Sequence, residues 1–183
     1  MKKEATVRKG YQAPEAPQRQ EGRLSGVTVC IDAGHQENGR FVNEPIGPGL
    51  SGSTSGKGGM AQGTKTNRRE SIVCLEIGML LRDELLRQGA NVVMTREDQT
   101  TFHTNIERCE IAEAGGAQIM LRLHCNNSSN RSKRGIQVYG PLNSDYAKAV
   151  ADADTYREMG QKLLDAMKTR VGMTLANSTG RCG

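Results

Sequence analysis

Apolar residues recur along this chain with two different spacings, which alternate from one segment to the next. Short apolar or β-branched runs, the pattern of buried strands, occupy residues 27–31, 91–96, 118–124 and 135–139. Apolar residues three or four positions apart, the pattern of amphipathic helices, occupy residues 67–88, 104–114 and 144–170. Strands that alternate with helices favour βαβ crossovers, so we expect an α/β fold: one mostly parallel, twisted sheet flanked by helices on both faces.

Two segments show neither spacing. Residues 1–26 combine many charges with two prolines, which predicts a flexible basic leader outside the fold and leaves residues 27–183 as a single domain. Residues 36–66 are rich in glycine and serine and include the run Glu44-Pro45-Ile46-Gly47-Pro48-Gly49. We expect this segment to be a long loop without helix or strand. Loops of such length are usually functional lids or disordered.

Composition argues against several classes of protein. A chain of 183 residues with 36% hydrophobic residues and 22 glycines is typical of one globular domain, not of a disordered segment. The formal net charge is +5, and residues 1–26, with six Lys or Arg and three Glu, supply +3 of it. The rest is nearly neutral, and aromatic residues make up only 3%. Both features argue against nucleic-acid binding.

Membrane and disulfide signals are also weak. No run approaches the roughly 18 apolar residues of a membrane span, and no apolar segment follows Met1-Lys2-Lys3 as in a secretory signal. We therefore expect no integral membrane segment in this chain, and we also expect a monomer. The five cysteines form no CxxC pair, and the placement of three in apolar runs favours buried free thiols: Cys30, Cys74 and Cys125.

Polar residues follow the carboxyl ends of two predicted strands. His35 comes after the first strand, and His124 ends the run at residues 118–124. Glu70 lies in the first turn of a predicted helix, which begins at the same rim of a parallel sheet, where ligands bind. Two imidazoles and one carboxylate are a ligand set of catalytic zinc, with a fourth position left for water. The same residue types also suit ferrous iron, and spacing does not separate the two metals.

Two of these residues also have a purely structural interpretation. Glu70 follows Asn67-Arg68-Arg69, where a capping-box glutamate would bond back to the start of its helix. His124 fits an interior strand histidine that is hydrogen-bonded to Asn126. A metal site requires that both residues instead face His35.

A series of short motifs, in one order, carries a resemblance to a known family. They are Val27 to His35 with its Asp-Ala-Gly-His end, Gly63-Thr64, the helix with Glu70, Val93 to Arg96, Asn105-x-x-Arg108 with Ile111-Ala112, and Leu121 to Asn126. On these residues the chain resembles the zinc-dependent N-acetylmuramoyl-L-alanine amidases of the type-3 class, from Val27 to the chain end. The Glu-Pro-Ile-Gly-Pro-Gly loop is similar to a variant in Gram-positive members.

The resemblance implies a function and a set of roles. The family hydrolyses the amide between the lactyl group of muramic acid and the first L-alanine of the peptidoglycan stem. It implies that His35, Glu70 and His124 bind zinc, and we expect Arg122 and Asn126 to contact substrate. Peptidoglycan is then the partner, and the protein is expected outside the cell or in the wall, as an autolysin or as a phage lysin released from the cytoplasm.

Other residues near these motifs have two interpretations each. Asp32 either orients a ligand or accepts hydrogen bonds from backbone amides after the strand. Arginines after the strands or in the second helix either hold carboxylates of the stem peptide or form surface and helix-end salt bridges: Arg96, Arg108 and Arg122.

The general base is the role that the sequence leaves open. In the family a glutamate on a last strand moves the proton, and by the resemblance that strand would come after Gly183. Glu37 and Glu44 in the long loop are the alternatives within this chain. A second hypothesis is therefore a catalytically idle module of the same fold that binds peptidoglycan or zinc, and a third, disfavoured by charge, is a nucleic-acid-binding domain.

Overall fold

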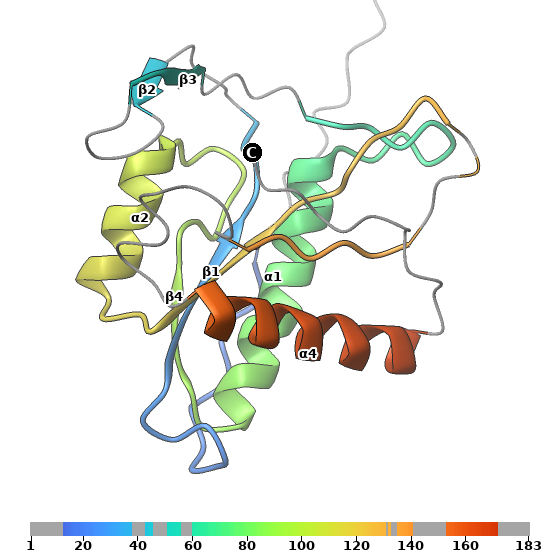
Figure 1. Ribbon diagram of the computed structural model, residues 1–183. Helices are drawn as coiled ribbons and strands as arrows, with labels where there is room; N and C mark the ends of the chain where they lie inside the picture. Colours follow the sequence, from blue (N-terminus) through green and yellow to red (C-terminus); the bar gives the residue numbers. More distant parts are fainter. Residues whose placement is uncertain are drawn as a thin grey trace, which may run out of the picture. The chain divides into compact units, whose positions relative to one another are not determined.

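The computed structural model describes residues 13–37, 43–45, 51–55, 60–130, 132, 135–140 and 153–171 (Figure 1). It contains a parallel sheet of three strands in the order β4-β1-β5. The strands are β1 (Thr28–Ala33), β4 (Asn91–Met94) and β5 (Ile119–Leu123). The α/β fold and the parallel sheet predicted from the alternating pattern are confirmed.

The register of the sheet aligns the carboxyl ends of β1 and β5. Asp32 pairs with Arg122 and Ala33 with Leu123. The backbone N–H of Gly34 then donates to Leu123 O at 2.9 Å, which extends the pairing beyond β1. Since β1 is the central strand and is buried from Val29 onward, the residue that follows it is fixed beside the residue that follows β5.

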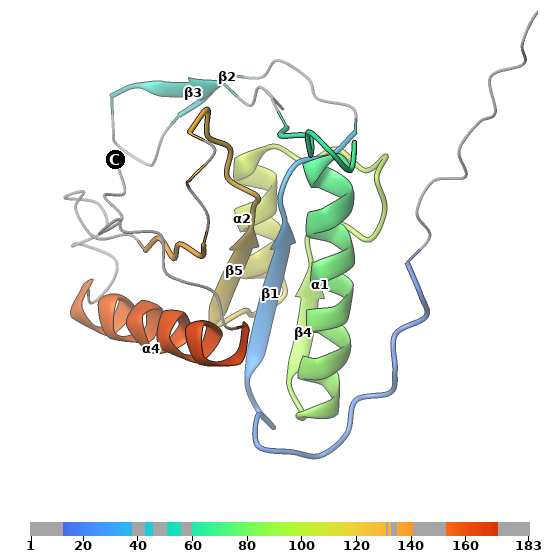
Figure 2. The ribbon, with the colours of Figure 1, turned by 90° about the vertical axis from the view of Figure 1, so that its right-hand side faces the viewer.

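Two helices cover opposite faces of the sheet. Met94 lies near Gly78 of α1 (Glu70–Arg87), whereas Val93 lies near Gly115 at the end of α2 (Asn105–Ala114). Adjacent strand residues point to opposite faces, so α1 and α2 pack on different sides, as Figure 2 shows. The capping box expected at Thr104 is present, with Glu107 as its partner.

Backbone contacts divide the chain into two compact units. One contains the three-stranded sheet, α1 and α2, and the other contains α4 (Ala153–Val171). The expected helix over residues 144–170 corresponds to α4, although residues 144–152 lie outside the described residues. Among the helices that the structure describes, none has the length and apolar composition to cross a bilayer.

Two local predictions are wrong. Within residues 36–66, β2 (Asn43–Pro45) and β3 (Ser53–Ser55) pair as a two-stranded sheet. Strands of three residues are too short to show an apolar alternation. Conversely, residues 135–139 alternate apolar and polar side chains but form no strand, because a strand exists only where a neighbour pairs with it and no described segment does so here.

Residues 13–26 differ from the flexible leader that composition suggested. They run along the carboxyl end of α1, where the last carbonyls of a helix have no partner within the helix. Three donors in this segment bond to carbonyls at the end of α1 and just after it: Gln20 N to Leu86 O (3.0 Å), Leu24 N to Gln88 O (2.8 Å) and Arg19 Nη1 to Gly89 O (2.7 Å). Ala13 packs on the core cluster, and residues 1–12 lie outside the described residues.

The core lies between α1 and the sheet. Cys74, Leu75 and Met79 of α1 are fully buried against Ala33 of β1. Cys30 and Cys74 are buried free thiols as expected, and Cys125 is half-buried against the same cluster. This packing fixes the amino-terminal turn of α1 beside the carboxyl end of β1, where the candidate site lies.

Candidate metal centre

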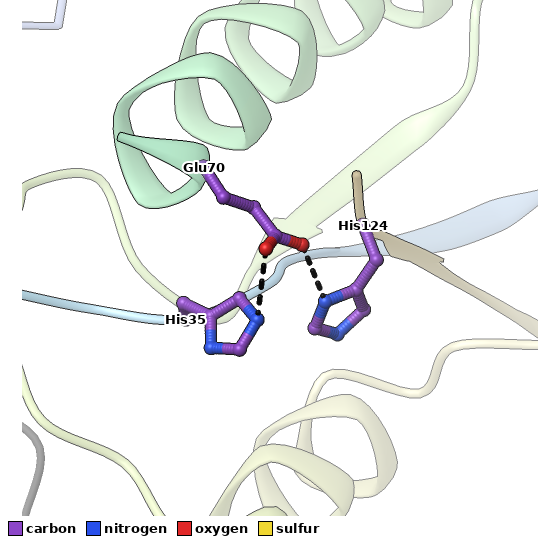
Figure 3. Close-up of side chains that lie close together, drawn as sticks. All are labelled: His35, Glu70 and His124. Carbon is purple, nitrogen blue, oxygen red and sulfur yellow. Dashed lines mark hydrogen bonds and ion pairs between the residues drawn. The ribbon is translucent and has the colours of Figure 1, made fainter. Parts of the chain in front are cut away.

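Two histidines and a glutamate converge at the carboxyl end of the parallel sheet (Figure 3). His35 follows β1, Glu70 is the first residue of α1, and His124 directly follows β5. The Glu70 carboxylate lies between the two rings, with Oε2 3.3 Å from His35 Nε2 and Oε1 3.0 Å from His124 Nδ1. One potential ligand atom from each residue lies within 4.8 Å of the others. The structure thus brings together the three residues that the sequence placed at one rim.

Backbone amides from two distant segments hold the Glu70 carboxylate. Ala61 N–H donates to Oε2 at 2.9 Å, and Cys125 N–H donates to Oε1 at 2.7 Å. The capping-box interpretation of Glu70 is wrong, because the N-cap, Arg69, takes part in no side-chain capping bond. Burial alone would raise the pKa of Glu70, but the hydrogen bonds from Ala61, Cys125 and His124 hold it below its usual value. The carboxylate is therefore an anion in a fixed position, and each oxygen has one amide donor and a second side that faces a histidine ring, where a cation would bind in place of that contact.

Two properties of His35 suit a metal ligand: its imidazole pKa and its backbone conformation. Burial lowers the pKa of its imidazole; Glu70 opposes this, and His124 and Arg108 reinforce it. The neutral imidazole that results is the form that binds metals. Its φ of 55° lies in the left-handed region, which costs energy for a residue with a side chain and is typical of functional sites.

Gly34 allows the two histidines to approach each other. A Cβ at this position would lie 2.4 Å from Leu123 O and 2.6 Å from His124 Cε1, so no larger residue fits without movement of β5. The rings of His35 and His124 meet edge to face, with centroids 4.7 Å apart. The Asp-Ala-Gly-His sequence at the end of β1 therefore includes a glycine for a steric reason.

Comparisons with known proteins decide the family. The family model described as N-acetylmuramoyl-L-alanine amidase matches residues 29–181. The chain belongs to this amidase family. Comparison with curated proteins gives no match.

Three solved amidase structures are similar to the chain. The apo form of Ami1 from Mycobacterium abscessus has a TM-score of 0.61 and 20% identity, over 86% of this chain and 73% of that chain. The catalytic domain of CwlV from Bacillus (Paenibacillus) polymyxa var. colistinus has a TM-score of 0.55 and 23% identity, over 81% and 66%. AmiC2 of Nostoc punctiforme has 29% identity and a TM-score of 0.44, over 58% of this chain and 48% of that one. The chain thus spans about half of AmiC2 and two thirds of CwlV, and the first two likenesses show the shared fold.

In this member of the amidase family, Arg96 holds the segments that carry two of the three site residues. Its guanidinium is buried and donates to Ala33 O at 2.7 Å, Gly34 O at 2.9 Å and Ser71 O at 2.8 Å. Burial lowers the pKa of Arg96 to about 10, so it stays charged at neutral pH. The two roles expected for Arg96, a substrate contact and a surface salt bridge, therefore do not apply, because its N–H groups donate to buried carbonyls.

Asp32 is the centre of a second buried network on the α2 side. Its Oδ1 accepts hydrogen bonds from Thr95 Oγ1 at 2.7 Å and from Arg108, and its Oδ2 accepts one from Arg122 Nε at 2.5 Å. Burial opposes ionisation of Asp32, but the two guanidinium groups keep its pKa below the usual value. The expectation that Asp32 accepts hydrogen bonds from backbone amides is wrong, since side chains fill its oxygens, and its link to the His35 segment runs through Arg108.

The network also supports the segment after His35. Arg108 donates to Gln36, the residue next to His35, and to Ala33 O at 3.2 Å. Arg108 is buried, so it is a structural residue of this rim. Sequence reasoning placed Asn105-x-x-Arg108 among the family motifs, but only the fold shows that this helix start reaches the end of β1.

The two loop carboxylates considered as general bases are engaged elsewhere. Glu44 accepts hydrogen bonds from the N–H groups of Asn105 (2.9 Å) and Ile106 (2.8 Å), which caps the amino end of α2. Burial would raise the pKa of Glu44, but these amides lower it. Glu37 forms an exposed ion pair with Arg69 at 2.5 Å. Neither carboxylate is among the residues that gather at the metal centre.

Proposed function

We propose that this chain hydrolyses the amide bond between N-acetylmuramic acid and L-alanine in peptidoglycan, with a zinc ion bound by His35, Glu70 and His124. Membership in the amidase family supports the reaction. The convergence of two imidazoles and a buried carboxylate on one point supports the metal. On this proposal the protein acts at the cell wall.

The donor set fits such an ion. Zinc in catalytic sites takes three protein ligands drawn from histidine and carboxylate, at about 2.0–2.2 Å each. Ligand atoms 3.0 and 3.3 Å apart can surround a centre at that distance, and the Glu70 anion would balance part of its charge. When bound, zinc supplies a Lewis acid that polarises an amide carbonyl and lowers the pKa of water towards about 7.

The residues of this chain hold the metal ligands in position and supply the negative charge of the site. Amides of Ala61 and Cys125 fix the Glu70 carboxylate, so it does not reorient when a cation arrives. Arg96 fixes the ends of the segments that carry His35 and Glu70. His124 is partly exposed, with 44% of its side chain accessible, so the site is open to solvent beside this ring.

Release of amino groups from peptidoglycan tests the reaction. The zinc-loaded chain is incubated with purified peptidoglycan, and newly exposed L-alanine amino groups and new reducing sugar ends are measured separately. We expect amino groups without reducing ends. Reducing ends alone would identify a glycosidase, and absence of release from a zinc-loaded chain that still sediments with peptidoglycan would identify a binding module.

Metal analysis tests the site independently of turnover. We expect one zinc per chain, lost in His124→Ala and Glu70→Gln and retained in Arg87→Gln, which changes an exposed arginine paired with Glu84 in the last turn of α1. Reconstitution with ferrous iron in parallel decides between the two metals that this donor set suits. Full zinc content in His124→Ala would contradict the assignment.

A further inference from the structure

Arg122 lies on the same exposed row as a site histidine. Along and beyond β5, Leu123 and Cys125 are half-buried against the core cluster, whereas Arg122 and His124 are exposed. Side chains two positions apart in an extended segment lie on one side, about 6–7 Å from each other. Arg122 therefore flanks the metal centre at the distance that about two residues of an extended peptide span.

Two hydrogen bonds hold the guanidinium of Arg122 in place. Nε donates to Asp32 Oδ2 at 2.5 Å, and Nη1 donates to Asn105 Oδ1 at 3.0 Å. Among the described residues, Nη2 donates to no acceptor, and 38% of the side chain is exposed. An arginine fixed by two anchors loses little conformational freedom when it binds a further group.

Arg122 is the exposed end of a buried network of charged side chains. Asp32 is a single carboxylate shared by Arg108 and Arg122, and Arg96 lies nearby with only neutral carbonyl partners for its hydrogen bonds. Arg96, Arg108 and Asp32 are buried, so Arg122 is the member of this group that meets solvent. Glu44 is bonded to the other face of Asn105, so the attraction for a substrate carboxylate comes from the exposed edge of Arg122 itself and not from a net charge of the network.

We propose that Arg122 binds a carboxylate on the peptide side of the substrate and sets a preference for stems that carry this group free rather than amidated. This inference rests on the proposed amidase function. A guanidinium held by Asp32 and Asn105 can donate from its free edge to a carboxylate oxygen, and the spacing to His124 places that carboxylate within about two residues of the scissile amide. Arg122 is thus a specificity-determining residue.

Two soluble substrates that differ in one charge test the preference. MurNAc–L-alanyl–D-isoglutamic acid has a free α-carboxylate on the second residue after the scissile bond, and MurNAc–L-alanyl–D-isoglutamine has an amide of the same shape there, while both keep the γ-carboxylate. We expect zinc-loaded wild type to prefer the acid in kcat/KM. Arg122→Gln lowers kcat/KM for the acid by about 10- to 100-fold and for the amide by less than about 3-fold, the value of one charge-assisted contact.

Two further variants separate binding from structure. Arg122→Lys keeps the charge but not the fork, and it is expected to retain part of the preference. Arg87→Gln, at the other end of α1, is expected to leave both substrates unchanged. Zinc content and unfolding midpoint are measured for each variant. An equal loss on both substrates in Arg122→Gln, or an unchanged preference, would overturn the inference.

Binding of the product dipeptides distinguishes this inference from the reaction itself. L-alanyl–D-isoglutamic acid and its amide are titrated into zinc-loaded protein by calorimetry. If the chain cleaves neither substrate but binds the acid more tightly, and Arg122→Gln removes that difference, the role of Arg122 stands and the proposed hydrolysis fails. Equal affinity of wild type for both dipeptides overturns the role of Arg122.

Discussion

Replacement of Gly34 by alanine tests whether the close approach of β1 and β5 sets the spacing of the two histidines. The added Cβ would lie 2.4 Å from Leu123 O, whereas real Cβ contacts are essentially never below 3.0 Å. The end of β5 must therefore move by at least about 0.6 Å, the difference between these distances, and by about 1.0 Å to reach ordinary contact at 3.4 Å. Binding sites need their ligands within about 0.5 Å of the productive geometry.

We expect Gly34→Ala to lower zinc affinity by about 10- to 100-fold, the usual effect of disturbing a group that positions a ligand. Affinity is measured by competition with a chromophoric chelator, and folding by circular dichroism. The matched control is Gly78→Ala in α1, where the added Cβ lies 3.4 Å or more from its neighbours. It is expected to keep zinc affinity and to stabilise the fold by about 1 kcal/mol. A folded Gly34→Ala protein with wild-type zinc affinity would refute the steric argument.

Three further changes test the surroundings of the site. Removal of residues 1–26 is expected to lower the free energy of unfolding in urea by about 2–4 kcal/mol, because it removes several hydrogen-bond partners from the end of α1. An unchanged urea midpoint would show that these contacts contribute nothing to stability. Arg108→Gln is expected to lower the free energy of unfolding by about 3–5 kcal/mol, because it removes a partner of buried Asp32. Adding Asp32→Asn to this variant should recover part of the lost stability. Additive losses in the double variant would contradict the coupling of the two residues. Hydrogen bonds from Thr101 and Thr100 lower the pKa of Asp98 from 3.8 to about 2, so Asp98→Asn should be less stable than wild type at pH 7. The difference in free energy of unfolding between the two proteins should close as the pH falls from about 4 to about 2. A difference independent of pH would refute this role of Asp98.

Local patterns in the sequence were sufficient for the elements that form the sheet layers. The β-branched run at residues 28–31 and the helical spacing after Glu70 each reflect burial against the rest of the molecule, and the structure has β1 and α1 there. The convergence of His35, Glu70 and His124 followed from one topological rule, that parallel strands end at a common rim. Neither inference needed knowledge of a specific contact.

Features that depend on distant partners were beyond this kind of prediction. Residues 13–26 have the composition of a leader, yet they are ordered by carbonyls at the end of α1 that no local pattern reveals. Residues 135–139 have the reverse property: Ile136 and Val138 alternate with polar residues, but no described neighbour pairs with them. Asp32 and Arg108, 76 positions apart, meet only because α2 begins above the end of β1.

The buried arginines show how the fold and the site depend on the same contacts. Where β1 ends, the carbonyls of Ala33 and Gly34 accept hydrogen bonds from arginine side chains, and a buried carbonyl without a donor is costly. Arg96 donates to both, and its second branch also reaches Ser71 O, next to Glu70. The planar guanidinium reaches these three acceptors from two separate nitrogens, Nε and Nη2, in one fixed geometry. The side chain that satisfies the strand end therefore also joins the segment of His35 to that of Glu70, so the geometry of the metal centre follows from the way in which β1 ends.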